Sequence, residues 1–142
     1  MNKLVIEGEL TALNEFINAE RRNRFIAANI KKKETGYCKE VAEASGIELR
    51  DFPLAVLITW YVKNKRKDAD NIAFAKKFIL DGLVEAGVLP NDNRKYIQGF
   101  VDIVKEDKEH QRIEITFVPI ESLINSLHSI QEVIEEIKEE EE

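Results

Sequence analysis

The chain has 142 residues, a single cysteine and a formal net charge of −6, with 21 lysines and arginines against 27 acids. A chain of this length forms one domain that buries roughly two thirds of its unfolded surface, so it needs neither disulfides nor a structural metal to fold. No segment approaches the ~18 consecutive apolar residues of a membrane span, and the first ten residues lack the apolar core of a signal peptide. We therefore expect a cytoplasmic protein with no membrane partner.

The negative charge is concentrated at the C-terminal end of the chain. Residues 121–142 carry eight acids and one lysine, whereas residues 1–67 carry 13 lysines and arginines against nine acids. Binding to phosphates needs local positive charge rather than a basic protein. The acidic pI weakens the case for a nucleic-acid partner but does not exclude one.

The first elements in chain order are a short strand and a long helical region. Residues 3–9 are β-branched and apolar enough for a strand, which Gly8 is expected to end. A helical pattern begins at about Asn14, a residue suited to capping a helix N-terminus. Gly36 predicts a break before a second helical piece at residues 37–44.

Six cations lie on the polar face of this helical region, with Glu20 as the acid beside them. They are Arg21, Arg22, Arg24, Lys31, Lys32 and Lys33. A run of charges is most often a solvated helix face. Because these cations are bunched, we expect them to contact the phosphates of a nucleic acid.

Residues 54–62, LAVLITWYV, form an apolar run with heavy β-branching, typical of a central strand buried on both faces. Three cations, Lys65, Arg66 and Lys67, follow it and lead into D-A-D-N at residues 68–71. Apolar residues then recur at helical spacing from 72 to 86, and Gly87 is expected to end that helix.

Asp68 and Asp70 are the candidate metal ligands of this central stretch. In an extended backbone their side chains point the same way, with Cα atoms about 6.6 Å apart. Carboxylates in this arrangement suit Mg²⁺ or Mn²⁺, and the adjacent cations would attract a phosphate backbone. The commoner origin of such a segment is an exposed turn with a helix cap, here Asn71. A third acid, Asp92, lies in the loop after the helix and could complete the site if that loop folds back.

The remaining elements are expected to be two strands and a final helix. Residues 96–104 and 112–118 alternate, with Ile97, Val101 and Ile103 on one face of the first strand, and the segment between the strands reads as a long hairpin turn. Pro119 stands where a first helical residue is expected.

From residue 120 to 137, apolar residues recur at spacings of three and four, which amounts to about two and a half heptads. Because that is too short for an autonomous coiled coil, this helix should pack against the body or against a partner's helix. We therefore predict an α+β domain over residues 1–120, with a mixed sheet of about four strands and helices packed on it, followed by an acidic helix and tail over residues 121–142.

Three motifs occur in a recognisable order: D-x-D-N at residues 68–71, K-x-x-x-D-G-L at 77–83 and A-G-x-L-x-N-D at 86–92. This order resembles the RusA family of Holliday-junction resolvases, found in phages and prophages. Residues 13–33 are also similar to the N-terminal region of phage members. The resemblance covers most of residues 1–118 and does not extend to the acidic tail.

The resemblance implies a homodimeric, Mg²⁺-dependent endonuclease that nicks two strands of a four-way DNA junction. By motif position, Asp68, Asp70 and Asp92 would hold the metal, and the cations of the helical region together with Lys65, Arg66 and Lys67 would hold the branched DNA. A lysine would assist at the scissile phosphate.

The position of that lysine departs from the family pattern. In the better-known members it lies one turn after the second aspartate, where this chain has Phe74. The downstream D-G-L selects Lys77 instead, because positions four and seven after Asp70 share one face of a continuous helix, whereas Lys76 does not lie on that face.

Two other functions remain open from the sequence. One is a metal-dependent nuclease that uses the same acids on flaps or other branched DNA. The second is a non-catalytic phage DNA-binding or assembly protein, in which the heptad helix contacts the partner and the acids are structural.

Overall fold

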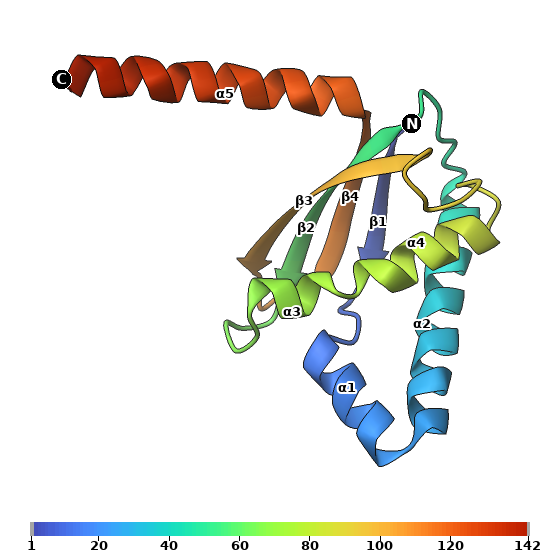
Figure 1. Ribbon diagram of the computed structural model, residues 1–142. Coiled ribbons are helices and arrows are strands. Elements are labelled where there is room, and N and C mark those ends of the chain that lie inside the picture. Colours follow the sequence, from blue (N-terminus) through green and yellow to red (C-terminus); the bar gives the residue numbers. More distant parts are fainter. Residues whose placement is uncertain (1, 142) are drawn as a thin grey trace.

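One mixed sheet forms the centre of the computed structural model, which describes residues 2–141. Its strands run in the order β1-β4-β2-β3 (Figure 1). Their bounds are β1 (Lys3–Glu7), β2 (Leu54–Val62), β3 (Ile97–Glu106) and β4 (Arg112–Pro119). The predicted α+β class with a four-stranded mixed sheet is confirmed.

Strand β2 occupies an interior position of the sheet, as its continuous apolar run predicts. It pairs with β3 in parallel and with β4 in antiparallel orientation. A parallel pair needs a crossover connection, and here the chain returns through α3 (Ala69–Ala73) and α4 (Lys76–Glu85). The carboxyl ends of β2 and β3 therefore meet at the same edge of the sheet.

The predicted hairpin between the last two strands is wrong. Because β2 lies between β3 and β4 in the sheet, residues 107–111 cross the end of β2 rather than closing a turn between paired strands. The backbone N–H of Asp107 donates to the carbonyl of Val62 at 2.7 Å, which fixes the crossing. Alternating polarity indicates a strand but does not say which strand lies beside it.

A β-bulge near the start of β3 moves the side chain of Ile97 to the opposite face of the sheet from the one it would otherwise occupy. Leu54 pairs with Ile97, but the next residue of β2, Ala55, pairs with Gly99, so the register shifts by one residue between them. Such a shift moves side chains to the opposite face of a sheet. Ile97 therefore does not share a face with Val101 and Ile103, contrary to the prediction.

The long N-terminal helical region is divided at Asn23 rather than at Gly36. Helix α1 (Leu13–Arg22) is followed by α2 (Arg24–Ser45), and the Asn23 side chain accepts a hydrogen bond from the Phe25 N–H at 2.8 Å. Helix α2 runs through Gly36 and ends at Gly46, whose φ of 68° is a left-handed conformation that glycine adopts readily. Ala12, not Asn14, is the N-cap residue of α1.

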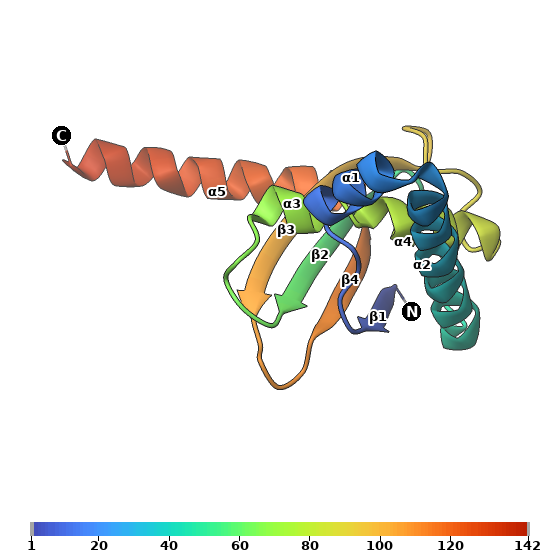
Figure 2. The ribbon, with the colours of Figure 1, turned by 90° about the horizontal axis from the view of Figure 1, so that it is seen from below.

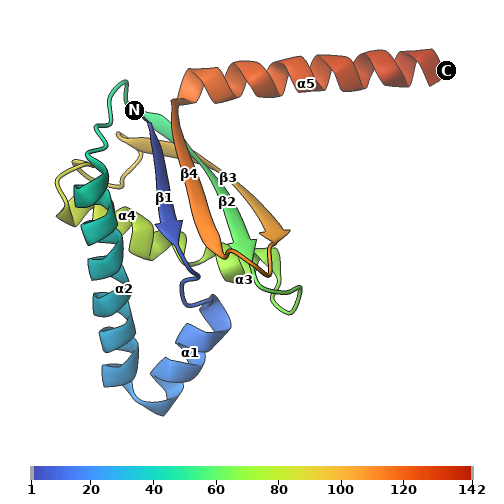
Figure 3. The same ribbon diagram turned by 180° about the vertical axis from the view of Figure 1, so that it is seen from behind.

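Helices α1 to α4 lie on one side of the sheet, and the side chains between them and the strands form the core (Figure 2). Ile6, Ile58 and Ile115 from the sheet and Phe78 and Leu83 from α4 are buried there. Seen from behind, the opposite face of the sheet carries none of these four helices (Figure 3).

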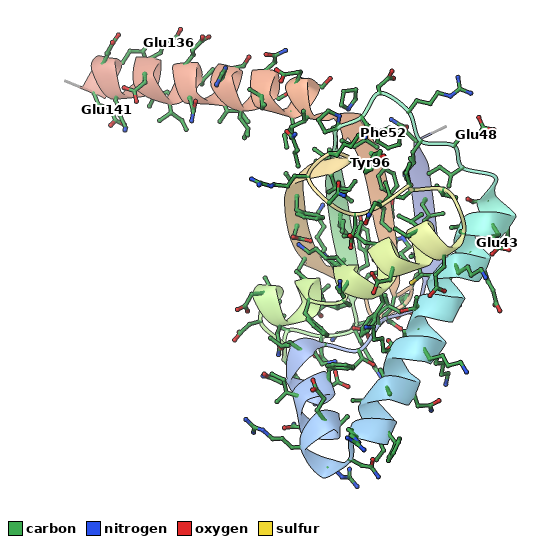
Figure 4. The ribbon with its side chains drawn as sticks, turned by 45° about the vertical axis from the view of Figure 1, so that its right-hand side comes forward. Glu43, Glu48, Phe52, Tyr96, Glu136 and Glu141 are labelled. Atoms are coloured by element: carbon green, nitrogen blue, oxygen red, sulfur yellow. The ribbon has the colours of Figure 1, made fainter. Side chains whose placement is uncertain are left out.

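Helix α5 (Ile120–Glu141) follows β4 directly and extends away from the domain (Figures 1 and 3). Pro119 is the last residue of β4 rather than the first of the helix. Only the first turn of α5 reaches the sheet, where Ile120 and Leu123 lie against Gly99. The rings of Phe52 and Tyr96, which pack edge to face 5.2 Å apart, lie near this end, whereas Glu136 and Glu141 lie far out on the helix (Figure 4).

Within residues 2–141, no helix combines the length and the apolar character needed to cross a bilayer.

Candidate functional site

The segment that leaves the carboxyl end of β2 carries the two candidate metal ligands. Asp68 has the extended backbone of an N-cap residue of α3, but its side chain makes no capping hydrogen bond. The Asp70 carboxylate accepts a hydrogen bond from the Asn71 N–H at 2.9 Å. Both aspartates are exposed, so their oxygens are accessible from solvent.

Asn71 caps a helix, but not its own. Its side-chain oxygen accepts a hydrogen bond from the Asn14 N–H at 2.9 Å, and Asn14 lies in the first turn of α1. The first N–H groups of a helix have no partner within the helix, so a side chain from elsewhere can satisfy one of them. The expected local cap is thus wrong, and Asn71 joins the start of α3 to α1.

The helix after the D-A-D-N segment is not continuous. Helix α3 ends at Ala73, α4 begins at Lys76, and a turn at Phe74 and Ala75 separates them. Counting residues from Asp70 along a single helix therefore gives the wrong face for the residues that follow. Lys76 and Lys77, the first two residues of α4, contact different carboxylates.

Lys76 lies in a hollow beside Asp70, which we call the Asp70 hollow. The residues that line it are Ala69, Asp70, Ala73, Phe74, Lys76 and Asp102. Lys76 forms an ion pair with Asp102, and its ammonium nitrogen lies 4.5 Å from the centroid of the Phe100 ring. The side chain of Lys76 is only 22% exposed, against 56% for Lys77. Lys76 is therefore a partly desolvated lysine held in one position.

Asp102 holds Lys76 and is itself held by β2. The Trp60 indole N–H donates to Oδ1 of Asp102 at 2.9 Å, while Oδ2 receives Lys76. A charge that is mostly removed from water needs such partners. Sequence reasoning missed Asp102, although a lone carboxylate between Val101 and Ile103 was a signal that this position of the strand has a polar partner.

Asp92 lies in a second hollow, between α2 and α4, which we call the Asp92 hollow. Its lining includes Lys31, Lys32 and Thr35 from α2, Asp81 and Glu85 from α4, and Asn91 and Asp92 from the following loop. The ammonium of Lys77 lies 3.9 Å from the carboxylate of Asp92 and 3.7 Å from that of Asp81. The loop does fold back, but it brings Asp92 to Lys77.

The three predicted metal ligands are therefore not gathered at one point. Asp70 and Asp92 line different hollows. In the part of the chain that the structure describes, no three His, Cys, Asp or Glu side chains form a group that could hold a metal ion. Asp68 and Asp70 remain a pair of exposed carboxylates at the start of α3.

The predicted DNA-binding cations spread over several surfaces. Lys31 and Lys32 line the Asp92 hollow, whereas Lys33 lies in another hollow together with Glu34 and Tyr37. The three arginines, Arg21, Arg22 and Arg24, are exposed at the corner between α1 and α2. Lys65 and Arg66 are exposed after β2, and Lys67 forms an ion pair with Glu15 of α1.

No protein-family model matches the chain, and no curated protein matches it. The resemblance to the RusA family therefore rests on the sequence motifs alone.

Proposed function

We propose that this protein is a Mg²⁺-dependent endonuclease that resolves four-way DNA junctions by paired nicks and acts as a homodimer. One observation carries the proposal furthest: Lys76, held by Asp102 of β3, lies in the same hollow as Asp70, which follows the carboxyl end of β2. The carboxyl ends of parallel strands are the usual place for ligands in open sheets of α/β proteins. The carboxylates of Asp68 and Asp70, together with the fixed ammonium of Lys76, would form a site suited to a phosphate ester.

The donors at this edge fit a magnesium ion. Mg²⁺ usually binds one or two carboxylates and completes its shell with waters and substrate phosphate oxygens, and the side chains of Asp68 and Asp70 are exposed. When bound, the ion supplies a Lewis acid and an activated water. Asp92 is the third carboxylate that the resemblance implies. To join the pair, Asp92 has to leave its ion pair with Lys77.

Lys76 replaces Lys77 as the proposed active-site lysine. Its ammonium faces the Asp70 hollow, where it would neutralise a non-bridging oxygen of the scissile phosphate. Asp102 and Trp60 do not touch the phosphate in this scheme and act as positioning residues through their contacts with Lys76 and with each other. Lys77 instead pairs with Asp81 and Asp92, two residues that line the Asp92 hollow.

Cleavage of a panel of four-way, three-way and linear DNA substrates tests the reaction. Wild type with Mg²⁺ should place symmetric nicks in the four-way junction, and Asp70→Asn or removal of Mg²⁺ should abolish them. Titration of Mn²⁺ monitored by calorimetry should lose its binding heat in Asp70→Asn. Equal heats and equal cleavage for wild type and variant would refute the metal site.

The choice of lysine has its own test. Lys76→Met should lower the cleavage rate by about 10²–10³-fold, the usual cost of removing one group that stabilises transition-state charge. Lys77→Met is the matched control, since it removes the same charge from the next residue, and it should change the rate only a few-fold. The opposite ranking would return the role to Lys77 and to the Asp92 hollow.

Binding of the DNA arms is proposed for the basic residues, including Lys31 and Lys32 at the Asp92 hollow. Contacts to phosphates release counterions, so affinity should fall steeply with salt. Replacing both lysines by Gln should reduce the slope of log affinity against log salt by about 2 per chain. Lys39→Gln, on the same helix but paired with Glu43, is the control and should leave the slope unchanged.

The exposed apolar residues of α5 favour one rival, a non-catalytic assembly protein that binds its partner through this helix. Junction binding without cleavage at any divalent metal would support that rival. Cleavage of flaps or three-way DNA in preference to four-way junctions would instead support a nuclease for other branched DNA.

A further inference from the structure

Helix α5 presents an apolar face that nothing in residues 2–141 covers. It has 22 residues, and none of them is buried. Leu127, Ile130, Ile134 and Ile137 are 46%, 56%, 45% and 50% exposed. Beyond its first turn the helix runs clear of the sheet and of the other helices (Figures 1 and 3).

These four residues form one continuous seam. Their spacings of three, four and three place them on one side of a helix, in the arrangement of coiled-coil core positions. Helices in proteins gain most of their stability by packing an apolar face against another part of the structure. The seam is therefore expected to be covered by another helix when the protein is folded and assembled.

The charge distribution along α5 favours one orientation for a pair of these helices. Acids are dense in its second half, from Glu132 to Glu141, whereas the first half carries Glu121 and otherwise neutral polar residues such as Ser122, Asn125 and Ser126. Paired helices lie about 8–10 Å apart, close to the Debye length at physiological salt. A parallel pair of these helices would place the two acidic halves side by side. An antiparallel pair would place each acidic half beside a neutral half.

We propose that α5 pairs in antiparallel orientation with α5 of a second copy of this chain. Aligning the uncovered seam in this way sets Leu127 against Ile137 of the partner and Ile130 against Ile134 of the partner, in two identical halves. This is the self-complementary contact of a two-fold dimer. A helix of this length spans only about 33 Å, so the pair supplies part of the dimer interface rather than a complete standard one.

The helix pair would join the two chains that the proposed nuclease needs for paired nicks. Only this role of the pairing rests on the proposed function, because the contact itself needs no DNA and no metal. With α5 as the link, two domains would be held at the ends of an antiparallel helix pair. Each domain then keeps its own Asp70 hollow on its helix-covered side.

Sedimentation of the full chain tests the pairing. Wild type at tens of micromolar should have twice the 16.4 kDa mass of one chain. Ile130→Asp with Ile134→Asp should give a monomer, or weaken dimerisation at least 100-fold, while its thermal unfolding stays close to that of wild type. Asn125→Asp with Ser129→Asp adds the same charge to the same helix away from the four seam residues, and it should remain a dimer. A monomeric wild type, or a dimer that survives the seam substitutions, would overturn the proposal.

Cross-linking tests the orientation. The native Cys38 is buried and does not compete for oxidation. Leu127→Cys and Ile137→Cys chains should form a mixed disulfide when combined and little disulfide when oxidised separately. Disulfides that form only within each separate variant would show a parallel pair and would overturn the antiparallel assignment. These results are independent of cleavage, so a failure of the nuclease proposal and a failure of the pairing are distinguishable.

Discussion

Replacing Gly82 by alanine should destabilise the protein even though alanine is the better helix former. Gly82 lies within α4 where this helix meets α2, and an added Cβ would lie 2.7 Å from the Cβ of Cys38, 2.9 Å from the Lys39 nitrogen and 3.0 Å from the Thr35 oxygen. Two of these atoms are backbone, so no side-chain rotation relieves the contact. The gain in helix propensity is about 1 kcal/mol, whereas overpacking a close contact costs about 1–3 kcal/mol or more.

We therefore expect Gly82→Ala to lose up to about 2 kcal/mol of unfolding free energy, the remainder after these opposing effects. Gly36→Ala is the matched control. Gly36 also lies inside a helix, but an added Cβ there meets nothing within 4 Å, so this variant should gain about 0.5–1 kcal/mol.

Urea unfolding and thermal melting measure both changes, and for a chain of this size 1 kcal/mol corresponds to a shift of about 3–4 °C in Tm. If Gly82→Ala were as stable as Gly36→Ala, α2 and α4 would not approach each other as described. The Asp92 hollow, which lies between α2 and α4, would then not have the lining described.

Two further predictions concern titratable groups. Burial raises the pKa of the Cys38 thiol to about 12, so this thiol should not react with a disulfide reagent at pH 8 in the folded protein, and denaturant should make it react at once. Near the start of β4, hydrogen bonding to Arg112 lowers the pKa of Asp107 below its ordinary 3.8, and hydrogen bonding to Lys3 lowers the pKa of Glu114 below its ordinary 4.5. Because both pKa values are lower in the folded state, their stabilisation is present above about pH 4.5 and is lost as the pH falls through the folded-state values. Tm should therefore fall less between pH 6 and pH 3 in Asp107→Asn with Glu114→Gln than in wild type, and an equal fall in both proteins would contradict the assignment.

The strands were the most predictable part of the fold because their signal is local. The apolar run of β2 and the alternation of β4 specify strands within about one residue of their bounds. The pairing partners of the strands are not specified locally, because the order of strands in a sheet depends on how distant segments of the chain pack against one another. The parallel pairing of β3 with β2 and the bulge between Ile97 and Gly99 came from the structure alone.

The position of Asp68 and Asp70, between β2 and the next helix, was predictable, but the arrangement of the residues beyond them was not. Neither Gly nor Pro marks the break between α3 and α4, so the sequence pattern predicts one helix. The rings of Phe16, Phe74 and Phe78 pack against one another there, with centroids 5.5–5.9 Å apart. This packing with α1 accompanies the turn at Phe74, and the turn determines which lysine lies beside Asp70.

Helix α1 is coupled to the candidate site by three contacts of different kinds. Asn71 accepts a hydrogen bond from its first turn, Lys67 pairs with Glu15, and Phe74 packs on Phe16. Lys67, Asn71 and Phe74 all lie in residues 67–74, the segment that also carries Asp68 and Asp70. The exposed arginines at the far end of α1 are therefore held in a defined position relative to the two carboxylates. A DNA arm bound at that corner would be positioned with respect to the Asp70 hollow by the fold itself, without relying on a flexible basic tail. If the protein is the proposed nuclease and its contacts are mainly to phosphates, these contacts would fix the orientation of the DNA without reading its sequence.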